Sequence, residues 1–284
     1  MLPQPMARAV LLMILAMTLI PSGDAAAKLL TGHHGASPIW AAWSRFAIGT
    51  LLVLPFTPRS AWAHLTDWRV ILRALCITGG IFCILNALRL EPMANVFGAF
   101  FFGPILGYIL SWWLLKESVT LGRTVLLVLG FSGVLLVVKP GFGMTTGLLW
   151  AVAAGTFYGC FLTASRWIAD VAPARTLLFS QLIIAMIVTT PMALLSWPTI
   201  TPHVATYATL SAVGSMAGNF MLIFALRLQP STKMAPFVYF QLVAATVLGY
   251  LIFNTLPDTL TWMGLGILIA SGFGSLLLPD RRGR

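Results

Sequence analysis

The stretches ALRLEP, at Ala87–Pro92, and ALRLQP, at Ala225–Pro230, share five of their six letters and lie 138 residues apart in a chain of 284. The first stretch closes the third hydrophobic run of the chain, and the second closes the eighth. Both keep Arg and Pro at the same places, which chance matching in a Leu-rich chain explains poorly. The pair therefore predicts that the chain contains two copies of one unit.

The composition indicates that this unit lies in a membrane. The chain is 59% hydrophobic and 8% charged, with a mean hydropathy of +0.93, whereas a soluble domain carries about 25% charged residues. Apolar runs of about 20 residues, long enough for a helix to cross a bilayer, recur throughout. Because the lipid interior cannot satisfy free backbone groups, these runs predict helices. We predict an all-α membrane protein with ten transmembrane helices, near residues 9–30, 37–56, 70–88, 93–114, 119–138, 145–168, 174–196, 206–226, 232–254 and 259–278.

The formal net charge of +10 reflects membrane topology in this interpretation. Ten spans place thirteen basic residues on the side of both termini and three on the other, a bias that predicts cytoplasmic termini. No nucleic-acid-binding patch remains. We expect the lipid bilayer as a partner and a cytoplasmic membrane as the location. The thirteen are Arg8, Arg59, Arg69, Arg73, Lys116, Arg123, Arg166, Arg175, Arg227, Lys233, Arg281, Arg282 and Arg284, and the three are Lys28, Arg89 and Lys139.

The duplication divides the chain into a first repeat, residues 1–140, and a second repeat, residues 141–284. Gly107-Tyr108 in the first is answered by Gly249-Tyr250 in the second. Five helices per repeat is an odd number, so the second repeat enters the membrane from the opposite side. Inverted repeats are typical of secondary transporters, which open a central site to each side in turn. A signal peptide cleaved near Ala25–Ala27 is an alternative, but its removal would leave one repeat without its first helix.

Small residues spaced one helical turn apart predict close packing between helices. Such pairs occur at Gly103 and Gly107, at Gly155 and Gly159, and at Gly214 and Gly218. Because they occur in both repeats, they favour a compact bundle.

Two ionisable residues inside the spans are the leading site candidates, because charge within a bilayer is costly and usually functional or paired. Asp24 lies near the outer end of the first helix, and Arg45 lies at a similar depth on the second. Both should sit about 10 Å below the outer surface, so we expect an ion pair. It could be a structural clamp, an outer gate, or a substrate contact in which Arg45 binds a carboxylate. Lys28 is expected to extend toward the lipid headgroups.

Polar and aromatic residues in mid-helix form a second group of candidates. Their polar atoms could bind a substrate, or could equally join two helices. The aromatic residues on the fourth helix share one face, which would suit a partly apolar metabolite if it faces a cavity. The polar and tyrosine candidates are Gln181, Asn219, Gln241, Tyr158 and Tyr239, and the aromatic pair on the fourth helix is Phe97 and Phe101.

Enzyme motifs are absent from the sequence. No Lys is followed by Ser or Thr, which excludes a Walker A motif, and neither G-x-S-x-G nor H-E-x-x-H occurs. The four histidines fall in loops, so we expect no metal site, cofactor or catalytic residue. A channel for small solutes is the alternative from another class, but neither a repeated pore segment nor a ring of like charges is visible. The sequence leaves monomer or homodimer open.

The sequence resembles the drug/metabolite transporter superfamily, in particular its ten-helix EamA-type members, over its full length. The resemblance rests on GDAAAK (23–28), SRF (44–46), GPILGYILSWWLLKESVTLGR (103–123), GFSGVLLVVKPG (130–141) and APFVYFQLVAATVLGYLIFNTLPD (235–258).

Within this superfamily the sequence looks most similar to bacterial S-adenosylmethionine permease-type members. The resemblance implies alternating access around a central cavity, with the fifth and tenth helices peripheral. It implies transport of an amino-acid-like, S-adenosylmethionine-like or related amphipathic metabolite, with an amino-acid or drug exporter as the alternative. Related permeases often carry charges where this chain has Leu162, Val238 and Gln241, and an acid where it has Thr255. These departures indicate that the charge of an inherited site has changed.

Overall fold

The structure, a computed structural model, describes residues 4–116, 121–141, 143–168, 170–228 and 235–274. These residues form α-helices and short 3-10 helices, without a strand among them. Six of the described helices are long and apolar enough to cross a membrane, and three shorter apolar helices accompany them. Gln229 and Pro230 lie outside the described residues, as do the expected span ends at 119–120, 232–234 and 275–278.

The helices follow the expected apolar runs closely. Their bounds are α1 (Gln4–Gly32), α2 (Pro38–Val53), α3 (Trp68–Leu90), α4 (Met93–Phe100), α5 (Phe102–Leu115), α6 (Leu121–Val138), α7 (Thr146–Trp167), α8 (Ala174–Leu195), α9 (Pro202–Leu228), α11 (Phe240–Phe253) and α12 (Thr259–Gly274). Three 3-10 helices join them: η1 (Leu54–Phe56), η2 (Arg59–Thr66) and η3 (Ala235–Tyr239).

Side-chain caps explain where several helices begin. The Ser37 hydroxyl accepts a hydrogen bond from the Trp40 amide at 3.2 Å at the start of α2. Thr145 caps α7 in the same way, accepting from the Leu148 amide at 3.1 Å. Such caps satisfy amide groups that have no partner within the helix.

The single helix predicted over 93–114 is divided into α4 and α5 at Phe101. Pro104 explains the break, because it has no N–H to donate to the Phe100 carbonyl and its ring crowds that carbonyl. The span predicted over 232–254 is also divided, since η3 precedes α11 and Tyr239 stands at the junction. The Phe101 and Tyr239 rings lie against each other, with centroids 4.8 Å apart.

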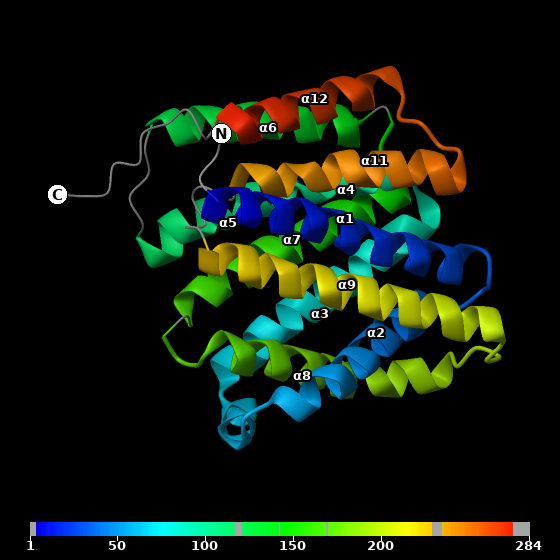
Figure 1. Cartoon of the computed structure of the whole chain (residues 1–284). Coiled ribbons are helices and arrows are strands. Elements are labelled where there is room, and N and C mark those ends of the chain that lie inside the picture. The colour runs from blue at the N-terminus through cyan, green and yellow to red at the C-terminus, as the bar shows by residue number, and fades with distance from the viewer. Residues whose placement is uncertain (1–3, 117–120, 142, 169, 229–234, 275–284) are drawn as a thin grey trace.

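Helices of the first half of the chain pack mainly against helices of the second half (Figure 1). Helix α1 packs on α9 and α11, while α7 packs on α3 and α5. Helix α2 packs on α8, and α6 packs on α12 at one edge of the bundle.

Close contacts in this bundle use the predicted glycine pairs. A Cβ placed on Gly103 would lie 2.6 Å from the Gly155 carbonyl oxygen, and one placed on Gly23 would lie 2.8 Å from the Ser211 carbonyl oxygen. The backbones of α5 and α7, and of α1 and α9, therefore approach each other too closely for any side chain.

Contacts between loops define two ends of the bundle. At the first end, Ser37 and Ser196 share a hydrogen bond at 2.8 Å, and the His34 and His203 rings stack at 5.6 Å. Glu91 bonds to Thr145, and Lys139 bonds to Asp258, at the same end. We call it the Ser37 end.

At the opposite end, the Trp68 and Trp167 rings meet at 5.4 Å, and Trp62 packs on Phe179 at 5.2 Å. We call this the Trp68 end. Loops 33–37, 91–92, 139–141, 143–145, 196–201 and 254–258 thus gather at the Ser37 end, while 54–67, residue 168 and 170–173 lie at the Trp68 end (Figure 1).

Candidate functional site

A buried ion pair joins α1, α2 and α9 below the Ser37 end. Arg45 Nη2 lies 2.8 Å from Asp24 Oδ1, and the two side chains are only 6% and 5% exposed. Arg45 also donates to the Ser211 hydroxyl, from Nε at 3.2 Å and from Nη2 at 2.8 Å. The equal depth expected from the sequence therefore places Asp24 and Arg45 in contact. We call Asp24, Arg45 and Ser211 the outer cluster.

The Asp24 carboxylate keeps acceptor capacity within this cluster. Its Oδ1 atom is close enough to Arg45 to count as ion-paired, but the approach is not aligned as a hydrogen bond, and Oδ1 has no hydrogen-bond partner in the described residues. A buried carboxylate oxygen without aligned donors can accept a hydrogen bond from a ligand. The pair can thus hold the helices together and still offer one polar contact.

Lys28, which was expected to extend toward the lipid headgroups, bonds within the protein. Its ammonium group donates to the carbonyl oxygens of Leu88 and, at 2.6 Å, of Glu91, and it lies 5.3 Å from the centroid of the Phe253 ring. These carbonyls stand at the C-terminal end of α3, which carries partial negative charge and attracts cations. Lys28 is therefore a structural cap that ties α1 to α3.

An aromatic ladder runs between α4 and α7. Phe97 packs on Phe100 at 6.4 Å, Phe100 on Tyr158 at 4.9 Å, and Tyr158 on Phe161 at 6.0 Å. The predicted candidates Phe97 and Tyr158 both belong to it, although Phe97 is fully buried and touches the remainder through Phe100. The four rings thus form a continuous series of aromatic contacts.

The ladder ends on Arg73 of α3, a residue that the sequence assigned to topology alone. Its guanidinium carbon lies 4.5 Å from the centroid of the Phe161 ring. Nε donates to the Ser165 hydroxyl at 2.7 Å, and Nη1 donates to the Leu177 carbonyl at 3.1 Å. Arg73 is 8% exposed. We call Arg73, Ser165 and Leu177 the inner cluster.

The remaining candidates divide into buried and exposed residues. Gln241 is buried on α11, two residues after Tyr239 in the chain. Gln181 on α8 is half-buried, and its Oε1 has no hydrogen-bond partner in the described part of the chain, so it keeps an acceptor free.

Asn219 belongs to neither cluster. It is exposed on α9, and its amide donates to the Ser215 carbonyl of the same helix at 2.8 Å. Its side chain bonds along its own helix rather than to either buried cluster, and its place in the site stays a prediction.

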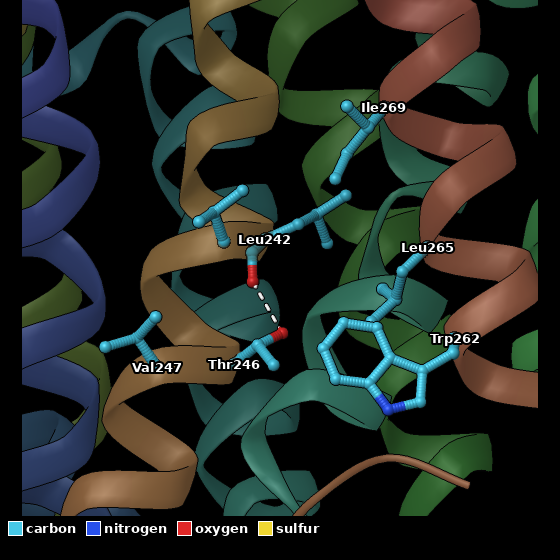
Figure 2. Close-up of a pocket in the computed structure, with 7 residues that line it drawn as sticks. Leu242, Thr246, Val247, Trp262, Leu265 and Ile269 are labelled. Atoms are coloured by element: carbon cyan, nitrogen blue, oxygen red, sulfur yellow. Dashed lines mark hydrogen bonds between the residues drawn. The ribbon is translucent and has the colours of Figure 1, made fainter. Parts of the chain in front are cut away.

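A small pocket of about 120 Å³ lies between α11 and α12 (Figure 2). Its lining is apolar except for Thr246, whose hydroxyl donates to the Leu242 carbonyl at 2.8 Å. Because that hydroxyl is already bonded, the pocket offers little to a polar substrate. Among the described residues, no group of three His, Cys, Asp or Glu side chains could hold a metal ion.

Residues 7–139 and 145–277 each match the sequence pattern of the EamA-like transporter family. The two matches cover most of the chain, so the protein belongs to this family of the drug/metabolite transporter superfamily. It is a membrane protein of a transporter family.

The similar proteins include S-adenosylmethionine uptake transporters of Rickettsia. The Rickettsia prowazekii (strain Madrid E) protein is 27% identical over 235 residues, covering 80% of this chain and 79% of its own length. The Rickettsia conorii (strain ATCC VR-613 / Malish 7) protein is 28% identical over 235 residues, with the same coverage. A crystal structure that is 20% identical covers 98% of this chain and 99% of its own, with a TM-score of 0.68. At that identity it supports the fold alone.

Proposed function

We propose that this protein is a secondary transporter that moves a small amphipathic metabolite across the bacterial cytoplasmic membrane by alternating access. The observation that carries the proposal is the reciprocal pairing of helices between residues 1–140 and 141–284. By their order in the two halves, α7 corresponds to α1, α3 to α9 and α5 to α11. The packing of α1 on α9 then corresponds to that of α7 on α3, and the packing of α1 on α11 corresponds to that of α7 on α5. Two copies of one unit that exchange partners in this way are typical of inverted-repeat transporters.

The loop contacts support ten membrane crossings. The connections after α1, α3, α6, α8 and α11 gather at the Ser37 end. The positive charges lie mainly away from that end, which supports cytoplasmic termini and an extracytoplasmic Ser37 end. The outer cluster then sits on the outer side of the path.

The chemistry of the clusters supports an S-adenosylmethionine-like or amino-acid-like substrate. Asp24 can accept from an ammonium group, and the aromatic ladder can face a sulfonium or a flat ring. The Rickettsia relatives are named for S-adenosylmethionine uptake. Neither import nor export is favoured by the contacts.

Counterflow in liposomes tests the transport activity. Purified full-length protein, reconstituted with unlabelled S-adenosylmethionine inside, should accumulate the labelled compound transiently and with saturation. Asp24→Ala and Arg45→Ala should each lower this flux more than they lower expression. Flux that rises linearly with concentration would instead indicate a channel.

Thiol labelling tests the inverted topology separately. In a variant whose three native cysteines are replaced by Ala, single cysteines at Glu91 and Gln229 should react with an impermeant reagent from opposite sides of the membrane. Labelling of both from one side would contradict the inverted repeat.

A further inference from the structure

Arg73 is a buried cation without a counter-ion. No carboxylate in the described residues pairs with it, and it contacts only a hydroxyl, a carbonyl and a ring face. A guanidinium has five N–H donors, and Nε and Nη1 each donate one, so Nη2 has no partner among the residues the structure describes. Buried charge is costly unless an opposite charge neutralises it.

Comparison of the two repeats shows that the inner cluster lacks a carboxylate. At the spacing of 138 residues that separates the paired hexapeptides, Arg73 corresponds to Ser211, the hydroxyl that binds Arg45. The same spacing relates Gly80 of α3, which packs against α7 near Tyr158, to Gly218 of α9, which packs against α1 near Ile20. The spacing therefore holds in three dimensions as well as in the sequence.

The position that holds the serine of the outer cluster on α9 therefore holds the arginine of the inner cluster on α3. In the outer cluster, α2 supplies the arginine and α9 the serine. In the inner cluster, α3, the counterpart of α9, supplies the arginine, α7 supplies the serine and α8 supplies the Leu177 carbonyl. The outer cluster contains its own carboxylate, Asp24, but the position 138 residues later is Leu162.

We propose that Arg73 is the anchor of a carboxylate-binding site at the inner end of the transport path. A carboxylate on Nη2 and Nη1 would supply the negative charge that Asp24 supplies to Arg45. The rest of such a ligand would lie along Phe161 and Tyr158, so the site selects carboxylates that also carry an apolar or flat group. This inference deepens the proposed transport function, but it concerns the anion and not the identity of the metabolite.

A matched pair of probes tests the charge directly. Binding of 3-phenylpropionate and of its neutral amide is measured by thermal stabilisation of the full-length protein in a neutral detergent, at constant ionic strength. Wild-type protein should bind the carboxylate at least tenfold more tightly than the amide. Arg73→Gln should abolish this preference. Arg69→Gln should keep it, because Arg69 lies one turn earlier on α3 and is already paired with Asp67 at 2.9 Å.

A second variant keeps the test decisive if Arg73→Gln does not fold. Ser165→Asp places a carboxylate where Arg73 Nε already finds a partner at 2.7 Å. It should raise the unfolding temperature of the unliganded protein and remove the carboxylate preference. Ser165→Asn, with a similar shape and no charge, should do neither to the same extent.

Three results would overturn the site. One is equal binding of the two probes by wild-type protein, and another is a preference that survives Arg73→Gln or Ser165→Asp. The third is loss of the wild-type preference in nanodiscs with phosphatidylglycerol but not with phosphatidylcholine, which would assign Arg73 to a lipid phosphate. None of these depends on S-adenosylmethionine flux, so failure here leaves the transport test unaffected.

Discussion

Removal of either charge of the outer cluster should destabilise the protein, and the two losses should be strongly coupled. Opposite unit charges about 4 Å apart attract by about 4 kcal/mol at an effective dielectric constant of about 20. Asp24 and Arg45 have atoms 2.8 Å apart and are almost fully buried, so solvent screens them little. Breaking such a pair costs about 3–5 kcal/mol, because one charge stays buried alone.

The two single variants should differ. Asp24→Asn leaves a guanidinium that cannot lose its charge, so we expect the full cost. Arg45→Gln leaves a carboxyl group that can bind a proton and become neutral, so its cost should be smaller. The double variant should cost at least about 2 kcal/mol less than the sum of the singles.

Unfolding by sodium dodecyl sulfate in mixed micelles measures these free energies. The exposed pair Asp67 and Arg69 provides the control, since its side chains are 20% and 39% exposed and such pairs couple by at most about 1 kcal/mol. Costs at Asp24 and Arg45 that add to within about 0.5 kcal/mol would refute the reasoning.

Three further predictions use the same measurements. Gly23→Ala should lower the free energy of unfolding by about 1–3 kcal/mol, because the new methyl group forces α1 away from α9. Gly266→Ala, with no atom within 4 Å of the new Cβ, should not destabilise the protein. Equal effects of the two substitutions would contradict the close contact. Lys28→Met should cost about 1–3 kcal/mol by freeing the carbonyls at the end of α3, and an unchanged free energy of unfolding would exclude the cap. The hydrogen bond from Lys139 lowers the pKa of Asp258 from 3.8 to about 2. The stability that this bond adds is therefore present above about pH 4 and lost as the pH falls toward 2. Lys139→Met should flatten that part of the curve of unfolding free energy against pH, and an unchanged curve would disprove the link.

The sequence predicted the helices and the ion pair well because both depend on distance along the chain. Apolar run length determines where a span begins and ends, and counting residues from each end put Asp24 and Arg45 at one depth. The break at Phe101 was missed, although Pro104 is visible in the sequence, because the apolar run continues through it.

The faces of the helices could not be predicted in the same way. In lipid, an outward face is as apolar as an inward one, so hydrophobic pattern does not distinguish them. Asn219 was therefore assigned to the interior although it is exposed. Arg73 was assigned to the interface because it lies near the start of α3, and its burial depends on contacts from α7 and α8 that no local pattern encodes.

The contact between Phe101 and Tyr239 has a kinetic consequence. The two residues are 138 apart, as are the starts of α5 and α11 that follow them, so at this spacing each is the counterpart of the other and exchanging the two repeats maps their contact onto itself. If the two halves exchange conformations, this contact is present in both the inward-open and the outward-open state. A substitution at Phe101 or Tyr239 should therefore change the rates of the conformational exchange in both directions alike. A substitution at Arg45 or Arg73 should instead favour the state that is open to one side of the membrane.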